Sequence, residues 1–132
     1  MSSTWRHPEE GIICVVDDDL SSLKAVVRLL RAAGFPIVAF EKPRLFLEYA
    51  KVCPVCLAII DLQMPEVSGL DVQRALYDFC PKAKVIIITG AQEPGIDRTI
   101  ALDQGAIAFL FKPFSRSALL EAIRIVYPVP SQ

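Results

Sequence analysis

Short blocks of apolar residues recur along this chain, and a longer amphipathic stretch separates each block from the next. A block that is apolar throughout is typical of a strand with both faces buried, whereas a strand with one wet face alternates apolar and polar residues. We predict five such strands, at residues 12–16, 37–40, 56–60, 85–88 and 107–111. Strands that alternate with helices favour a parallel sheet with helices on both faces, joined by right-handed crossovers.

The stretches between the strands carry apolar residues at helical spacing, and polar residues mark where several helices begin. Asp19 and Ser115 are placed to cap the first and last predicted helices, and Pro43 fits the first turn of the second. Ser68–Asp71 resembles a capping box at the start of the third. In the third and fourth helices, the apolar positions expected to face the sheet are Leu70, Ala75, Leu76, Phe79, Ile96, Ile100 and Ala101. The pattern predicts a doubly wound α/β domain with five helices.

The length of 132 residues fits one compact domain and leaves no room for a second. We expect an N-terminal tail at residues 1–10, the domain at 11–127, and a proline-rich tail or linker at 128–132. No apolar run approaches the roughly 18–20 residues of a membrane span, and the first residues lack the apolar core of a secretory signal. A net charge of −1 with scattered basic residues argues against a nucleic-acid surface. We therefore expect a cytoplasmic protein that binds neither membrane nor nucleic acid.

Four cysteines raise the question of a disulfide, a redox site or a metal. Cys53 and Cys56 have the spacing of a redox motif or of half a zinc site. A zinc site needs a second pair of ligands, and His7 is the only histidine of the chain. We interpret the cysteines as ordinary reduced thiols, while a redox role of Cys53 and Cys56 stays open.

Polar side chains stand where four of the predicted strands end. Asp17 and Asp18 follow the first strand, Asp61 the third, Thr89 the fourth and Lys112 the fifth. Each of these residues is ordinary alone, as a turn residue or a surface charge. Ligands of doubly wound folds bind beyond the carboxyl ends of the strands, so we expect these side chains to meet. Converging carboxylates repel one another, and Mg²⁺, which prefers oxygen ligands, relieves that repulsion and can also hold a phosphoryl oxygen.

Four segments at these strand ends resemble the receiver domain of bacterial two-component response regulators. They are VVDDD at 15–19, DLQMPEVSG at 61–69, ITG at 88–90 and FLFKPF at 109–114. Their order and spacing make the resemblance specific, and it covers residues 11–127. It implies a flavodoxin-like receiver fold with a five-stranded parallel sheet in the order 2-1-3-4-5.

The resemblance also implies a role for the acidic residues. Asp61 would be the phosphoacceptor, attacking the phosphohistidine of a sensor histidine kinase or of a phosphotransfer protein. Mg²⁺ would be held by the side chains of Asp18 and Asp61, by the backbone carbonyl of Gln63, and through water by Asp17. We interpret the neighbouring Asp19 as the helix cap rather than as a ligand.

The remaining roles implied by the resemblance concern the response to phosphorylation. Lys112 would pair with the Asp61 carboxylate and then with the phosphoryl group, and its bond to Pro113 would be cis. Thr89 and Phe109 would be the switch, Thr89 moving toward the phosphoryl group and Phe109 swinging inward. The output surface would be the fourth helix, the fifth strand and the fifth helix, which would contact an output domain or a partner protein. Whether phosphorylation produces a dimer stays open.

Three alternatives compete with this interpretation. A degenerate receiver, acting only as a protein-interaction module, would be expected to lack the acidic pair, the acceptor or the lysine, and none is missing here. Phosphatases of the haloacid dehalogenase type need a second Asp two residues after the nucleophile, where this chain has Gln63. A flavodoxin would carry a phosphate-binding loop after the first strand, and none follows. We therefore expect a signalling domain rather than an enzyme, either free-standing or cut from a longer regulator.

Overall fold

A computed structural model of the chain describes residues 11–90 and 95–126. Its centre is a sheet of five parallel strands in the order β2-β1-β3-β4-β5, as the resemblance implied. The strands are β1 (Ile12–Val16), β2 (Ile37–Phe40), β3 (Val55–Asp61), β4 (Lys84–Thr89) and β5 (Ala108–Phe111). The predicted blocks match these strands to within one residue at either end.

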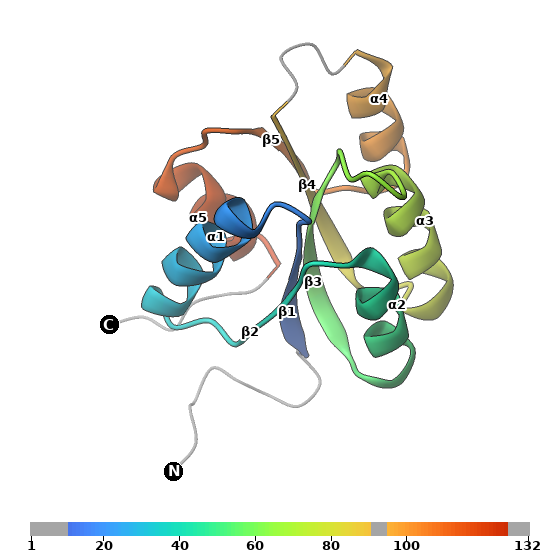
Figure 1. Cartoon of the computed structure of the whole chain (residues 1–132), viewed down its shortest axis with the longest axis horizontal. Coiled ribbons are helices and arrows are strands. Elements are labelled where there is room, and N and C mark those ends of the chain that lie inside the picture. The colour runs from blue at the N-terminus through green and yellow to red at the C-terminus, as the bar shows by residue number, and fades with distance from the viewer. Residues whose placement is uncertain (1–10, 91–94, 127–132) are drawn as a thin grey trace.

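Five helices cover the sheet in two layers. They are α1 (Leu20–Ala32), α2 (Pro43–Val52), α3 (Gly69–Phe79), α4 (Ile96–Asp103) and α5 (Arg116–Arg124). Figure 1 shows α1 and α5 on one face of the sheet and α2, α3 and α4 on the other. The two layers confirm the predicted doubly wound architecture. The tails predicted at residues 1–10 and 128–132 lie outside the described residues.

Alternate residues of the central strands supply two separate hydrophobic cores. In β1, Ile13 and Val15 pack with the residues of α1 and α5, whereas Cys14 and Val16 pack with those of α2 and α3. All four side chains are fully buried. This explains why the block is apolar without interruption, since neither face of the strand meets water.

Side-chain caps fix the beginnings of three helices. The Asp19 carboxylate accepts hydrogen bonds from the backbone of Ser21 and Ser22 at the start of α1. At the start of α5, the Ser115 hydroxyl accepts from the Ala118 amide at 3.0 Å. Ser68 caps α3 by accepting from the Leu70 amide, the second of the helix. A capping box would use the amide of the third residue, Asp71, which donates instead to the Ser68 carbonyl. These bonds satisfy amides that have no partner within the helix, and they confirm Asp19 as a cap.

Two of the apolar residues expected to face the sheet are exposed instead. Ile96 is 72% exposed and Phe79 is 39% exposed, so both predictions were wrong. Ile96 is the first residue of α4 and Phe79 the last of α3, where a helix extends past the core that its middle turns cover. The Phe79 ring instead lies under the ammonium of Lys51, 5.1 Å from the ring centre. Ala101, in the middle of α4, is buried as predicted.

A buried amide between α3 and α4 was not predicted. Gln73 is buried, and its side-chain nitrogen donates to the Ala101 carbonyl at 3.0 Å. Its side-chain oxygen accepts from Gln104, which follows α4, at 2.8 Å. A glutamine on a helix is usually exposed, and only the partners on α4 make this one a core residue.

The cysteines are free thiols, consistent with our interpretation of the sequence. Burial raises the pKa of Cys14 to about 12, which keeps this thiol protonated and unreactive. Within residues 11–90 and 95–126, no helix has the length and apolar character needed to cross a bilayer.

Candidate functional site

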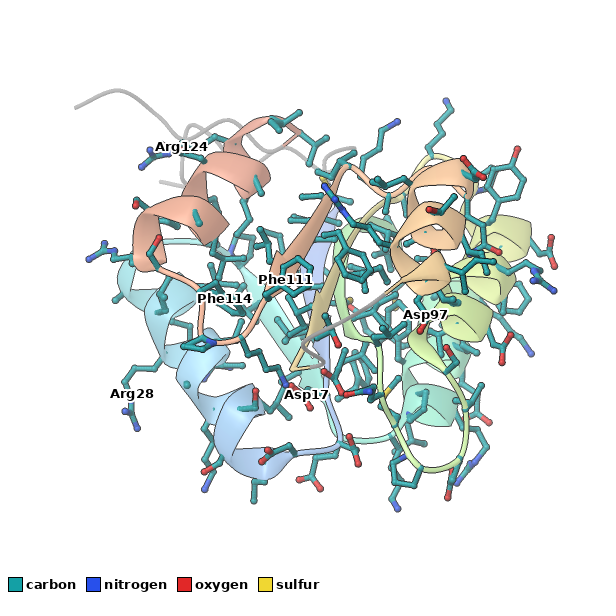
Figure 2. All side chains as sticks on the ribbon, turned by 90° about the horizontal axis from the view of Figure 1, so that it is seen from above. Asp17, Arg28, Asp97, Phe111, Phe114 and Arg124 are labelled. Atoms are coloured by element: carbon teal, nitrogen blue, oxygen red, sulfur yellow. The ribbon has the colours of Figure 1, made fainter. Side chains whose placement is uncertain are left out.

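The polar residues predicted at the strand ends converge on one edge of the sheet. Asp17 directly follows β1, Asp61 ends β3, Thr89 ends β4, and Lys112 directly follows β5. Backbone bonds hold this edge together, since the Lys112 amide donates to the Thr89 carbonyl at 2.7 Å and the Leu62 amide to Ile88 at 2.8 Å. Figure 2 labels Asp17, which lies between the two helical layers.

Lys112 joins the first and third strands through two carboxylates. Its ammonium lies 3.1 Å from Asp17 Oδ2 and 3.1 Å from Asp61 Oδ1. The lysine side chain is 25% exposed, whereas both carboxylates are buried. The other oxygen of Asp17 accepts from the Asp19 amide at 3.0 Å, so this buried carboxylate is bonded at both oxygens. The bond between Lys112 and Pro113 is cis, as the resemblance implied.

Burial and neighbouring charges make Asp61 a weaker acid than usual. Desolvation raises the pKa of its carboxyl from 3.8 to about 6, and Asp17 and Asp18 add to the rise. The hydrogen bond and charge of Lys112 lower the pKa but do not offset these effects. Burial alone would lower the pKa of Lys112, yet its bonds to Asp17 and Asp61 outweigh burial and raise it. Lys112 therefore stays protonated, and Asp61 is mostly ionised at pH 7.

The acidic cluster fits a divalent cation. One carboxylate oxygen from each of Asp17, Asp18 and Asp61 lies within 4.8 Å of the others. Three carboxylates against the single ammonium of Lys112 leave an excess of negative charge at a site with only oxygen donors. Hard cations prefer such ligands.

Gln63 lies at the open side of the acidic cluster. It follows Asp61 by two residues, its side chain is exposed, and it lines a shallow depression of about 750 Å³ together with Asp18. Of the acidic cluster, only Asp18 lines this depression. The role predicted for the Gln63 backbone carbonyl, as a metal ligand, stays a prediction.

The two predicted switch residues are both buried. Thr89 is fully enclosed at the end of β4. Phe109 in β5 packs in the core beside Ala101 and Ala106 and meets the Phe111 ring edge-on, with 5.5 Å between the ring centres. The structure therefore shows Phe109 in the inward position. The movement that couples Phe109 to Thr89 stays a prediction.

Gly69 holds the start of α3 against the backbone of Asp61, a feature that sequence reasoning missed. A Cβ atom at Gly69 would lie 2.5 Å from the carbonyl oxygen of Asp61 and 2.9 Å from Leu62 Cα. The Gly69 amide also donates to the Leu62 carbonyl at 2.8 Å. The sequence places Gly69 in the predicted capping box and in the receiver-like segment 61–69, and neither pattern predicts this close approach of two backbones.

The raised pKa of Asp61 predicts that metal-free protein loses stability as the pH rises. The folded state binds the Asp61 proton more tightly than the unfolded state does. The stability that this proton contributes to the folded state is complete at a pH below the pKa of Asp61 in the unfolded chain. It is lost as the pH rises through about 6, the pKa of Asp61 in the folded protein. We expect Asp61→Asn to gain about 1–3 kcal/mol of stability relative to wild type between pH 4 and pH 7, because Asn cannot ionise.

Urea denaturation in EDTA, at a series of pH values, measures this difference between the two proteins. Subtracting the two curves isolates Asp61, since the other titrating groups are common to both. A difference that stays constant over this range would show that Asp61 has an ordinary pKa.

A five-stranded parallel sheet in this order, with buried carboxylates and a lysine at its carboxyl edge, defines the receiver class of α/β domains. The response regulator receiver domain family matches residues 13–124. This chain belongs to that family.

Comparison with individual proteins agrees with the family. The chain is 37% identical over 128 residues to the response regulator protein TmoT of Ectopseudomonas mendocina, covering 96% of this chain and 57% of that protein. It thus spans little more than half the length of this curated relative.

Solved structures show the same architecture. A response regulator receiver domain protein from Methanospirillum hungatei JF-1 superposes with a TM-score of 0.81 at 25% identity, covering 87% of this chain and 91% of that one. A response regulator from Burkholderia pseudomallei superposes with a TM-score of 0.75 at 25% identity, covering 85% of this chain and 65% of that one. The latter was crystallised with a phosphorylated aspartic acid, a calcium ion and citrate.

Proposed function

We propose that Asp61 accepts a phosphoryl group from the phosphohistidine of a sensor histidine kinase or a phosphotransfer protein. The main support for the proposal is the position of Asp61 at the carboxyl edge of the sheet, where its carboxylate lies 3.1 Å from the Lys112 ammonium. An Asp61 oxygen forms the new bond to phosphorus while the bond between phosphorus and the imidazole nitrogen breaks. The imidazole keeps the electron pair of that bond and takes up a proton, and Asp61 becomes an aspartyl phosphate.

The other residues of the site favour this transfer through charge. Lys112 offers its ammonium to the phosphoryl oxygens, where it stabilises negative charge without leaving its place beside Asp61. Asp17, Asp18, Asp61 and the backbone carbonyl of Gln63 would hold Mg²⁺, whose bound charge neutralises the phosphoryl group. The phosphorylated aspartate and calcium ion of the Burkholderia pseudomallei protein support this assignment.

Phosphorylation would then change the surface of the domain. Thr89 ends the neighbouring strand β4, and its hydroxyl would donate to a phosphoryl oxygen. Its shift would be coupled to Phe109, and the signal would be read on the face of α4, β5 and α5. The domain at residues 11–127 would act in the cytoplasm as a signalling domain, with no separate substrate to turn over. Its target would be an output domain, a partner protein or a second phosphorylated copy.

Intact mass after incubation with acetyl phosphate tests the proposed acceptor. We expect wild type to gain one phosphoryl group with Mg²⁺ and none in EDTA, and Asp61→Asn to gain none. Asp103→Asn is the matched control, because Asp103 is an exposed acid at the end of α4, and it should be phosphorylated like wild type. A folded wild type that gains no group would favour the interaction module, and a gain that persists in Asp61→Asn would place the acceptor elsewhere.

A further inference from the structure

The edge strand β2 has backbone amides and carbonyls that are not bonded to any other strand in the described part of the chain. β2 is the last strand of the sheet and pairs only with β1 in the part of the chain that the structure describes. The Ile13 amide donates to the Pro36 carbonyl and the Asp17 amide to the Phe40 carbonyl, both at 3.1 Å. In a parallel pair of strands, every second residue directs its amide and carbonyl toward the neighbouring strand. The carbonyls of Pro36 and Phe40 face β1 in this way, so the amide and carbonyl of Ala39, the residue before Phe40, point away from β1. An exposed edge of this kind is a template for another strand.

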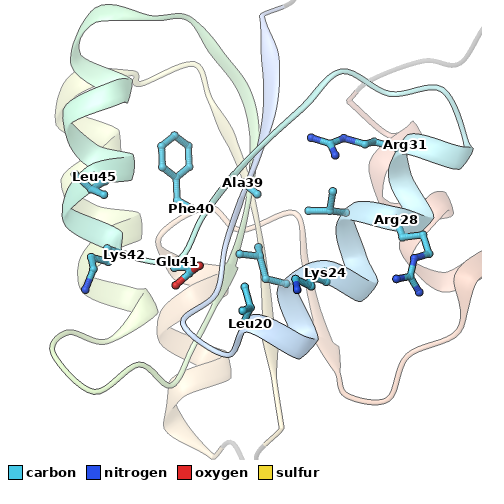
Figure 3. Close-up of a pocket in the computed structure, with 11 residues that line it drawn as sticks. Leu20, Lys24, Arg28, Arg31, Ala39, Phe40, Glu41, Lys42 and Leu45 are labelled. Atoms are coloured by element: carbon cyan, nitrogen blue, oxygen red, sulfur yellow. The ribbon is translucent and has the colours of Figure 1, made fainter.

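A groove of about 790 Å³ follows this edge (Figure 3). One wall is α1 and the other is the start of α2, with β2 between them. The apolar part of its lining is Leu20, Leu23, Val27, Ala39, Phe40 and Leu45. Leu20 and Leu45 are 45% and 44% exposed, although both are large apolar residues. The groove therefore offers an apolar surface beside an open backbone edge.

The charged groups around the groove are mostly basic. Lys24, Arg28 and Arg31 project from α1 and Lys42 stands on the opposite side, against the single acid Glu41. In the described part of the chain, none of these four basic side chains has an ion-pair partner. The whole chain carries a net charge of −1, so this excess of positive charge is a local feature. An acidic ligand is complementary to it.

We propose that the groove along β2 binds an extended acidic segment of a partner protein, which adds to the sheet as a sixth strand. The segment would bond to the backbone of Ala39, place apolar side chains on Leu45 at the face covered by α2, and direct carboxylates toward Arg28 and Arg31 at the face covered by α1. A helix would satisfy its own backbone and leave the edge unused. A second copy of this groove would bring basic residues against basic residues, which disfavours pairing of β2 with itself.

The surface is separate from the phosphoacceptor edge. Its lining includes neither Asp61 nor Lys112, and three of its four basic residues lie along α1. Binding at the groove and phosphorylation at Asp61 can therefore be measured independently. If the peptide did not bind, the proposed phosphorylation of Asp61 would be unaffected, and if Asp61 were not phosphorylated, peptide binding could still be observed.

Fluorescence anisotropy with the full chain and a short labelled peptide that alternates Glu and Val tests the proposal. We expect saturable binding that weakens with salt. The double change Lys24→Glu/Arg28→Glu should weaken it about tenfold, because two favourable charge contacts become repulsive. Arg98→Glu/Arg124→Glu alters the same number of exposed charges on α4 and α5 and should bind like wild type. Unchanged phosphorylation by acetyl phosphate would show that both variants are folded.

Two further probes distinguish strand addition from simple charge attraction. The same peptide with proline at alternate positions keeps the charges but cannot bond along an edge, and we expect it not to bind. In NMR spectra, the Ala39 amide should shift on binding and exchange more slowly with solvent. The proposal is wrong if the proline peptide or a single-stranded oligonucleotide binds as tightly, if no peptide binds, or if the chain alone dimerises through β2.

Discussion

Replacing Lys112 with Met is expected to lower the free energy of unfolding by about 2–4 kcal/mol at pH 7 without added metal. Met keeps most of the aliphatic chain but removes the ammonium that lies 3.1 Å from both Asp17 and Asp61. Two buried carboxylates would then face each other with no cation between them. The lysine is 25% exposed, so we expect less than the cost of breaking a fully buried pair.

The pH dependence of this loss distinguishes charge from packing. Wild-type Asp61 has a pKa of about 6, and without Lys112 that pKa should rise further, because the lysine lowers it. At pH 5 the variant would therefore carry a protonated Asp61 and lose much less stability than at pH 7. Lys82→Met is the matched control, since Lys82 is exposed and has no ion pair in the described part of the chain. Urea denaturation of wild type, Lys112→Met and Lys82→Met at pH 5 and pH 7 measures these differences. An equal loss of stability in Lys112→Met at the two pH values would show that the effect comes from packing rather than from charge.

Lys112→Met should also slow phosphorylation on the order of 100-fold, because a positioned charge that stabilises developing negative charge is lost. The rate of phosphoryl gain from acetyl phosphate at saturating Mg²⁺ measures this effect. The two rates are compared under conditions in which both proteins are folded, so that unfolding does not account for a slower phosphorylation. A rate like that of wild type would show that Lys112 serves the fold alone.

The ionised form of Asp61 destabilises the folded protein, as the proposed phosphoacceptor role would allow. Its ionised carboxylate is kept beside Asp17 and Asp18 in a buried position, where desolvation and repulsion both oppose its charge. Lys112 offsets only part of this cost, and a divalent cation or a phosphoryl group changes the balance of charge. A residue that destabilises the resting fold is expected at a site whose charge must change in use.

The sequence was enough to predict which polar residues meet. Asp17 and Asp61 come at the ends of blocks that are apolar on both faces, and such blocks belong in the middle of a parallel sheet. Lys112, in contrast, follows the block of the edge strand β5. Once these strands lie side by side, their ends must share an edge, so the site could be predicted without any knowledge of side-chain contacts.

What could not be predicted depends on contacts between elements. Gln73 is buried because its amide reaches Ala101 and Gln104 across the space between α3 and α4. Ile96 is exposed because it begins a helix, and helical spacing does not tell where the core ends. The partners of Gln73 lie far from it in the sequence. The periodicity of apolar residues reports neither such partners nor the point at which a helix extends past the core.

Gly69→Ala is expected to lower the free energy of unfolding by about 1–3 kcal/mol through overpacking at the start of α3. The new methyl group would lie 2.5 Å from the Asp61 carbonyl oxygen and 2.9 Å from Leu62 Cα. Both are backbone atoms, so no side chain can rotate away, and the end of β3 or the start of α3 must move. That movement would displace Asp61 relative to Lys112, so phosphorylation should slow as well.

Gly90→Ala is the matched control for this prediction. Gly90 follows Thr89 at the same edge of the sheet, yet a Cβ atom there would meet nothing within 4 Å. We expect its stability to lie within about 0.5 kcal/mol of wild type. Urea denaturation and the rate of phosphoryl gain, measured on both variants, separate the effect of the contact from the general effect of replacing a glycine. If both variants lost the same stability, the close approach at Gly69 would not be its cause, whereas a loss confined to Gly69→Ala would show that α3 positions the acceptor through the backbone.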